Sequence, residues 1–178
     1  IPNTTAYLSV NGEVWEDSEK KYFKAPHFRS VGYIFQDSGL LPFISVKNNL
    51  LYGLRRVPTD CQLNINMDTA IEMLGISKLL NQFPAELSGG EKQRVAIARS
   101  LIIGAKVFLF DEPMASLDED SKQEIFPYLL RLKNEIKTPM IYVTHSTSEA
   151  NVLCDQILKI HQGQIVSNNE YKEKYISI

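Results

Sequence analysis

Cysteine is scarce in this chain of 178 residues, which has only Cys61 and Cys154. The two are far apart, and neither belongs to a C-x-x-C pair or lies near a histidine at metal-ligand spacing. This pattern argues against a disulfide framework and against a cysteine-based metal site. We therefore expect two reduced thiols, as in a protein of the cytoplasm.

Long hydrophobic runs and an excess of one charge are also lacking. No apolar run approaches the roughly 20 residues that a helix needs to cross a bilayer, so we expect any membrane association to go through a partner. The net charge of −2 and a pI near 6.0 give no general attraction to nucleic acid or anionic lipid. With 44% apolar and 22% charged residues, the composition is that of a globular protein with one core or two joined lobes.

The most informative stretch begins with Leu87 and Ser88, followed by Gly89 and Gly90. After them comes a helical pattern of apolar residues: Val95, Ala96, Ile97, Ala98, Leu101 and Ile102. Two glycines leave backbone N–H groups unobstructed at the expected start of this helix, and such an end attracts phosphate.

A second informative segment, Val107–Phe110, is short and apolar and is followed by the carboxylates Asp111 and Glu112. It lacks glycine and proline, which predicts a strand buried on both faces of a parallel sheet. Ligands of such sheets bind beyond the carboxyl ends of the strands, so we expect a ligand beside the two carboxylates.

Taken together, five motifs in a fixed order resemble those of ABC-type ATPases. Gln36, after the apolar strand Val31–Phe35, resembles the Q-loop glutamine, and His145, after Ile141–Thr144, resembles the switch histidine. Between them lie segments that resemble the signature (Leu87–Glu91), the Walker B strand (Val107–Asp111) with its adjacent carboxylate Glu112, and the D-loop (Ser116–Asp118).

The resemblance implies an α/β fold, a P-loop NTPase-like ABC ATPase domain with a mostly parallel sheet flanked by helices. We expect one such domain over residues 1–178, made of four parts. They are an antiparallel β part with the Q-loop strand (1–36), an inserted helical subdomain (37–87), a core with the signature helix, Walker B strand and switch histidine (88–167), and a peripheral tail (168–178).

Local patterns predict the remaining elements. The chain should begin with a hairpin of Ala6–Val10 and Glu13–Trp15 around Asn11-Gly12, followed by a helix from Val46 capped by Ser45 and a polar turn-like segment over 58–66. Next come helices over 67–74, ended by Gly75, and over 77–83, and a helix over 121–136 that Pro127 kinks or breaks. The last elements are a buried strand over 140–144, a helix to Leu153 capped by Ser146 or Thr147, and a hairpin of 156–160 with 164–166 around Gln162-Gly163.

The resemblance also implies the site residues and the cofactors ATP and Mg²⁺. Asp111 would hold Mg²⁺, Gln36 would sense Mg²⁺ and the attacking water, and Glu112 would activate that water. His145 would donate to the γ-phosphate. Nucleotide held by an opposite subunit would be contacted by a group of residues on the signature and the D-loop: Ser88, Gly89, Gly90, Glu91 and Asp118.

One motif of such enzymes, the phosphate-binding loop G-x-x-x-x-G-K-[ST], does not occur in these residues. In the family it precedes the hairpin that here begins near Ala6. We therefore expect an N-terminally truncated domain, with the loop before Ile1 in the parent protein. The residues 1–178 alone should then be poorly stable and neither bind ATP tightly nor hydrolyse it.

The pattern Val31–Asp37, with Leu51–Leu54 and Phe126–Leu129, looks most like the ATP-binding subunits of molybdate importers. Importers of sulfate, iron or polyamines share much of it. We expect an ATPase at the cytoplasmic face of the inner membrane, in a head-to-tail dimer with a second ATP-binding subunit. Its further partners would be permease subunits and, indirectly, a substrate-binding protein, with Leu40, Leu41, Phe43 and Tyr52 as candidates for the partner surface.

Two alternatives remain open. The chain could belong to a non-hydrolysing subunit that lends its signature to another ATPase. An ABC ATPase of DNA repair or translation is disfavoured by the short insertion between Gln36 and Ser88.

Overall fold

The computed structural model describes residues 5–55 and 65–166, and the chain divides into two units. The larger unit is Ser30–His145, and the smaller one combines Ile1–Arg29 with Ser146–Ile178. The segment 58–64, Cys61 and the tail 168–178 lie outside the described residues.

The smaller unit begins with a three-stranded antiparallel sheet of β1 (Tyr7–Val10), β2 (Glu13–Asp17) and β3 (Tyr22–Phe23). Asn11 and Gly12 take positive φ angles of 49° and 80°, as a tight hairpin turn requires. The hairpin predicted at this dipeptide is therefore confirmed.

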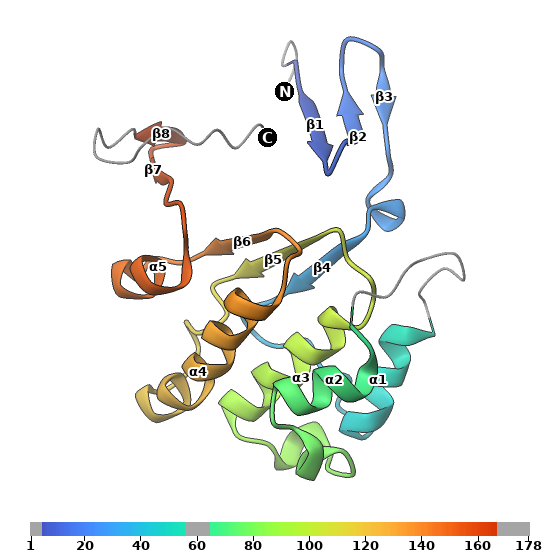
Figure 1. Cartoon of the computed structure of the whole chain (residues 1–178), viewed down its shortest axis with the longest axis vertical. Helices are drawn as coiled ribbons and strands as arrows, with labels where there is room; N and C mark the ends of the chain where they lie inside the picture. Colours follow the sequence, from blue (N-terminus) through green and yellow to red (C-terminus); the bar gives the residue numbers. More distant parts are fainter. Residues whose placement is uncertain (1–4, 56–64, 167–178) are drawn as a thin grey trace. The chain divides into compact units, whose positions relative to one another are not determined.

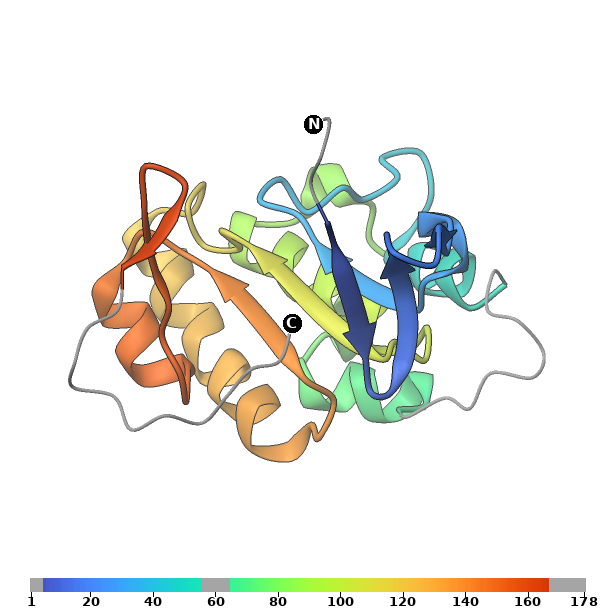
Figure 2. The ribbon, with the colours of Figure 1, turned by 90° about the horizontal axis from the view of Figure 1, so that it is seen from above.

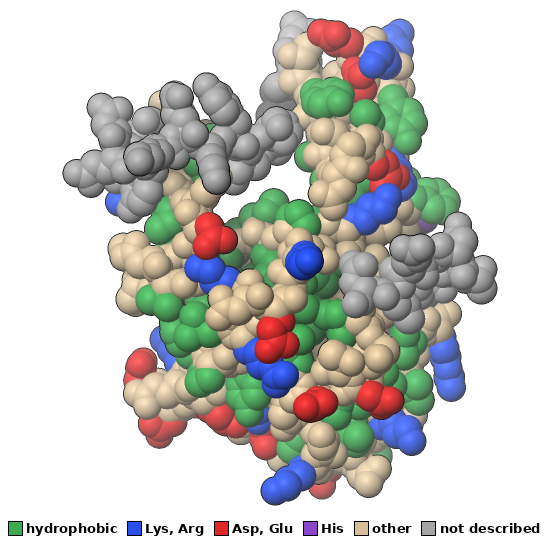
Figure 3. Space-filling view, viewed as in Figure 1, with side chains coloured by type: hydrophobic (Ala, Val, Ile, Leu, Met, Phe, Trp, Pro, Cys, Tyr) green, Lys and Arg blue, Asp and Glu red, His purple; other side chains and the backbone are tan. Residues whose placement is uncertain are grey.

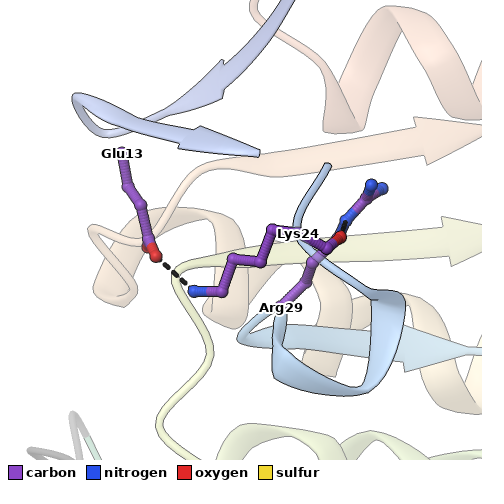
Figure 4. Close-up of polar contacts among 3 residues, drawn as sticks. All are labelled: Glu13, Lys24 and Arg29. Atoms are coloured by element: carbon purple, nitrogen blue, oxygen red, sulfur yellow. Dashed lines mark hydrogen bonds and ion pairs between the residues drawn. The ribbon is translucent and has the colours of Figure 1, made fainter. Parts of the chain in front are cut away.

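Charged side chains tie the segment after this sheet to its strands. Lys24 pairs with Glu13, and Arg29 Nε donates to the carbonyl oxygen of Lys24 at 2.8 Å (Figure 4). The Arg29 guanidinium also lies 4.9 Å from the ring centre of Phe23 and 5.8 Å from that of Trp15, within cation–π range. These contacts hold the chain around the short helix η1 (Pro26–Phe28).

The C-terminal part of the smaller unit contains α5 (Thr147–Leu153) and a hairpin of β7 (Lys159–His161) and β8 (Gln164–Val166). Ser146 Oγ accepts from the backbone N–H of Glu149 and caps α5, as predicted. The hairpin turns at Gln162 and Gly163, with φ angles of 50° and 78°, which confirms its predicted position. Cys154, directly after α5, is a half-buried thiol.

The larger unit is organised around a parallel sheet, in the order β4 (Val31–Ile34), β5 (Val107–Asp111) and β6 (Met140–Val143). The register places Tyr33 opposite Leu109 and Leu109 opposite Ile141. Figures 1 and 2 show α3 (Gly89–Leu101) and α4 (Glu119–Glu135) on the same face of this sheet. Because the three strands are parallel, their carboxyl ends lie at the same edge of the sheet.

The two faces of this sheet differ in burial. Ile34, Phe108 and Phe110 on the helix-covered face are 1–2% exposed. Gly32 belongs to the same layer, where an added Cβ would lie 2.4 Å from Phe108 Cδ1, so only glycine fits there. On the other face Ile141 is 54% and Val143 50% exposed. The prediction of a buried strand over 140–144 is therefore wrong for that face, because α3 and α4 cover only the opposite one.

Helices α1 (Val46–Leu54) and α2 (Met67–Met73) begin at Ser45 and Asn66, whose side chains accept backbone N–H groups. Gly75, with φ 62°, follows α2, as predicted. The predicted helix over 77–83 is wrong: only the 3₁₀ turn η2 (Ser77–Leu79) forms, because Phe83 is extended ahead of Pro84, where η3 (Pro84–Glu86) begins.

Helix α4 starts two residues earlier than predicted, after its cap Asp118, and runs through Pro127 without a break. Its apolar residues Ile125, Leu129 and Leu132 are buried. Burial of this stripe outweighs the one backbone hydrogen bond that a proline removes.

Asn49 on α1 fixes the loop that leads into this helix. Its side chain is fully buried and makes four hydrogen bonds. Oδ1 accepts from Leu41 N at 2.8 Å, and Nδ2 lies within 3.2 Å of the carbonyl oxygens of Leu41, Ile44 and Ser45. The loop over 41–45 is therefore ordered by one side chain.

None of the described helices is both long and apolar enough to span a membrane. On the face of the larger unit seen in Figure 3, basic and acidic side chains are interspersed over the helices. That face therefore offers no broad patch of one sign to a polyanion.

The role of Asn49 gives a first testable prediction. Asn49→Ala in the natural gene product would leave buried polar groups of the 41–45 loop without partners, and should lower the free energy of unfolding by about 2–4 kcal/mol. Urea denaturation measures this change. The matched control Asn48→Ala, an exposed position on the same helix, should change stability by less than about 0.5 kcal/mol. Equal effects of the two variants would contradict the assignment.

Candidate functional site

Three chemically active side chains meet at the carboxyl edge of the larger unit's sheet. Asp111 ends β5, Glu112 follows it, and His145 lies two residues after β6. The backbone N–H of Glu112 donates to Val143 O at 3.0 Å, and His145 Nδ1 lies 3.1 Å from Glu112 Oε2. An ionised carboxylate only accepts, so Nδ1–H of His145 is the donor in this pair. Two residues 33 positions apart in the chain are thereby joined at one edge.

Glu112 has an unusual backbone conformation, with a φ angle of 45°. Few residues other than glycine adopt the left-handed region, and such strain gathers at functional sites. The turn that follows is closed by a hydrogen bond from Ala115 N to Glu112 O at 3.1 Å. The strained turn places a carboxylate that is 34% exposed beside the half-buried Asp111.

Asp111 is held by a side chain from the neighbouring strand. The hydroxyl of Tyr33 on β4 donates to Asp111 Oδ2 at 2.6 Å. This hydrogen bond, more than desolvation, raises the pKa of Tyr33, so the phenol keeps its proton at neutral pH. The Tyr33 ring also packs on Phe35, with ring centres 4.2 Å apart.

The donor set at this edge suits Mg²⁺. Within residues 5–55 and 65–166 no group of three or more His, Cys, Asp or Glu side chains converges as a metal cage would. Mg²⁺ is bound instead through one or two carboxylates together with water and substrate phosphates. Asp111, a half-buried carboxylate with one oxygen on Tyr33, fits that requirement.

The signature residues form the start of α3. Ser88 Oγ accepts from Glu91 N at 3.1 Å, and Glu91 Oε2 accepts from Ser88 N at 2.8 Å. This reciprocal capping box satisfies two backbone donors that the helix itself leaves unpaired. Ser88 is exposed, while Gly90 is buried, so the chain presents the serine to solvent at a helix N-terminus.

The glycines of the signature lie against the segment that resembles the D-loop. A Cβ added to Gly89 would meet Leu117 Cδ2 at 2.9 Å, and one on Gly90 would meet Ser121 O at 3.2 Å. Asp118 caps α4 through Ser121, whose N–H lies 2.8 Å from Oδ1 and whose Oγ lies 3.0 Å from Oδ2. The hydrogen bonds from the Ser121 backbone and hydroxyl lower the pKa of Asp118.

An ion pair fixes α3 against α4 one turn further on. Arg94 is 6% exposed and reaches Glu124 Oε1 at 2.8 Å, with its guanidinium 4.7 Å from the ring centre of Tyr128. The signature helix and the helix after the D-loop therefore pack as one body.

The loop containing Gln36 is held by its backbone. Gln93 Nε2 donates to Phe35 O at 3.2 Å, Ser100 Oγ to Tyr33 O at 3.1 Å, and Arg99 Nη2 to Ser38 O at 3.3 Å. All three donors are on α3. Ser116 Oγ adds a fourth bond, to Gln36 O at 3.0 Å. The Gln36 side chain itself is exposed.

The sequence-predicted residues thus fall into two groups among the described residues. His145 contacts Glu112, the residue that follows Asp111 at the end of β5, and Ser88–Glu91 lies beside the D-loop. No hydrogen bond in this part of the chain joins the signature residues to Asp111, Glu112 or His145. Gln36 reaches the D-loop only through its carbonyl oxygen.

Sequence reasoning missed Tyr33 and Gln93. Tyr33 could have been found from strand alternation, since parallel strands in register place it on the same face as Asp111. Gln93 carries no such signal, because a glutamine on a helix is usually exposed and this one is 1% exposed.

Two proteins named as molybdenum import ATP-binding proteins are similar to this chain over most of its length. A molybdenum import ATP-binding protein ModC from Pseudomonas savastanoi pv. phaseolicola is 44% identical over 167 residues, which are 94% of this chain and 46% of the relative. ModC from Albidiferax ferrireducens is 42% identical over 172 residues, 97% of this chain and 46% of the relative. The chain thus spans less than half the length of these relatives.

The fold is also found in solved structures. Two dimeric structures of the ATP-binding cassette MJ0796 match. One, bound to ADP and Pi, has a TM-score of 0.64 and 23% identity over 94% of this chain and 72% of that chain. The other has a TM-score of 0.57 and 25% identity over 82% of this chain and 65% of that chain. The ABC cassette fold implied by the five motifs is therefore confirmed.

The family model described as ABC transporter matches residues 4–115, more than half of the chain. This range includes Gln36, the signature and the Walker B carboxylates, whose arrangement is described above. The chain belongs to the ABC transporter family.

Proposed function

We propose that this chain is the ATP-hydrolysing part of an ABC importer that takes up a small anion, with molybdate as the substrate. The observation that carries the proposal is the contact between His145 and Glu112 at the sheet edge where Asp111 ends β5. The names of the ModC relatives support the choice of substrate. Sulfate, iron and polyamine importers remain alternatives, because a binding protein and a permease select the cargo.

The proposed function gives each side chain a task. Asp111 would hold Mg²⁺, and Mg²⁺ bound with ATP would neutralise phosphate charge. Glu112, next along the chain, would orient and deprotonate the attacking water. His145, whose Nδ1 lies 3.1 Å from Glu112 Oε2, would donate to the γ-phosphate. Gln36, on a loop held by α3 and Ser116, would sense the metal and the water.

Ser88 and Gly90 would serve a nucleotide held by a second subunit. Ser88 is exposed at the start of α3, where N–H groups and the helix dipole favour phosphate. Glu91 shapes this end through the capping box, and Asp118 would line the same interface. The dimeric state of the MJ0796 cassette supports a dimer for this chain as well, and the proposed arrangement is head to tail.

The helical part offers a surface for a permease. Phe43 is 73% exposed although it lies in the loop that Asn49 orders, and Tyr52 is 38% exposed. Leu40 and Leu41, also predicted for this surface, are half-buried. An ordered loop that presents an aromatic ring suits docking to a membrane subunit, which would place the chain at the cytoplasmic face of the membrane.

A second candidate function is a non-hydrolysing subunit that lends Ser88 and Gly90 to a partner. The exposed capping box at Ser88 is compatible with it. The strained backbone of Glu112 favours the hydrolytic function, since lending a signature does not require that conformation.

The hydrolytic role predicts the effect of Glu112→Gln in the natural gene product. Loss of the general base should lower kcat for ATP hydrolysis by at least about 100-fold, with ATP still bound. Phosphate release and nucleotide binding measure the two properties. Glu119→Gln, an exposed position in the first turn of α4, serves as control and should keep wild-type turnover. Turnover that survives Glu112→Gln would favour the non-hydrolysing alternative.

The dimer predicts complementation between two variants. Ser88→Asp keeps an N-cap acceptor but places a negative charge where phosphate would bind. Protein carrying Ser88→Asp alone, or Glu112→Gln alone, should be inactive. A mixture of the two should regain ATPase activity, because one site per mixed dimer then combines an intact Glu112 with an intact Ser88. If the signature acted on its own subunit's nucleotide, the mixture would stay inactive.

The docking surface predicts that Phe43→Ser weakens co-purification with the permease while the melting temperature stays near that of the wild type. The control Phe28→Ser changes a ring that is 66% exposed in the smaller unit. It should leave co-purification intact. Undiminished recovery of the permease with Phe43→Ser would show that Phe43 is not part of the interface.

A further inference from the structure

Tyr33 lies beside the carboxylate expected to hold the metal. Its strand partner is Leu109, and Asp111 stands two residues further along β5 on the same face of the sheet. Such diagonal neighbours are within reach of a long aromatic side chain. The phenol of Tyr33 does span this distance: its hydroxyl donates to Asp111 Oδ2 at 2.6 Å.

The tyrosine is fixed at three points. Ser100 Oγ on α3 donates to its carbonyl oxygen at 3.1 Å, its ring packs on Phe35, and its hydroxyl ends on Asp111. The backbone of β4 is further held by its pairing with β5. The hydroxyl is therefore an anchored donor, and it limits the directions in which the Asp111 carboxylate can point.

An oriented carboxylate is what a weakly held hard cation needs. Carboxylates that bind metals are themselves hydrogen-bonded, and those outer partners set the orientation of the ligand. Because Tyr33 occupies Oδ2, the other oxygen of Asp111 stays available for a metal or its water. Phenylalanine at position 33 would keep the strand and the ring but supply no donor.

We propose that Tyr33 is a positioning residue, which orients the Asp111 carboxylate toward the divalent cation that accompanies the nucleotide. The proposal rests on the function proposed above and adds a residue to it. Tyr33 touches neither nucleotide nor water in this role. It acts only through Asp111.

The test uses Tyr33→Phe in the natural gene product, with Mn²⁺ as the metal probe and saturating ATP in the Glu112→Gln background to prevent turnover. Because ATP itself chelates Mn²⁺, unbound Mn²⁺ and MnATP are first removed by rapid desalting, and protein-bound Mn²⁺ is then measured by electron paramagnetic resonance. Loss of the hydroxyl should weaken Mn²⁺ binding by about 10–100-fold, the effect typical of removing an outer-shell partner. ATP binding without metal and the melting temperature should stay near those of the parent variant.

Two further variants separate positioning from a structural effect. Tyr22→Phe, which removes a half-exposed phenol from the sheet of the smaller unit, should leave Mn²⁺ affinity unchanged. In an Asp111→Asn background, Tyr33→Phe should add little to the loss, because both changes act through the same ligand. With Glu112 restored, excess Mg²⁺ should return kcat of Tyr33→Phe toward the wild-type value.

Unchanged Mn²⁺ affinity in Tyr33→Phe would overturn the proposal, and so would additive losses with Asp111→Asn. Failure of the proposed function gives a different result. In that case Mn²⁺ would not bind with ATP even when Tyr33 is intact, and the inference about Tyr33 would fall with it.

Discussion

The parallel, in-register pairing of β4, β5 and β6 is the constraint on which the rest of the larger unit depends. It brings the ends of three strands that are far apart in sequence to one edge, and it fixes which side chains share a face. His145 reaches Glu112, next to Asp111, because β5 and β6 end together. A shift of one residue in either pairing would turn every side chain of that strand to the other face, and the side chains at the strand ends would no longer lie together.

Helix α3 extends this constraint to the neighbouring segments. Its N-terminus is the signature, its Gln93, Arg99 and Ser100 hold the carbonyl groups around Gln36, and its Arg94 is paired with α4. The donors in these contacts are buried or half-buried side chains of α3. A displacement of α3 would therefore move the backbone of the Q-loop and the segment of the D-loop together.

The predictions from sequence succeeded where the signal was local. Caps at Ser45 and Ser146 and the turns at Asn11-Gly12 and Gln162-Gly163 all form, because a cap or a tight turn depends on a few adjacent residues. Other outcomes depend on distant groups. Burial of Ile125, Leu129 and Leu132 keeps α4 continuous through Pro127, so of the kink or break predicted there the break does not form. The predicted burial of the strand over 140–144 is wrong for Ile141 and Val143, because helices cover only the other face of β6.

The sequence by itself determined the family and the order of the motifs, since motif spacing is written along the chain, and it predicted Asp111, Glu112 and His145 as site residues. Only the tertiary structure decided that Tyr33 bonds Asp111 and that Gln93 holds the Q-loop backbone. Those contacts join residues 78 and 58 positions apart. Strand register and helix docking create such proximity, and no local pattern of residues encodes either of them.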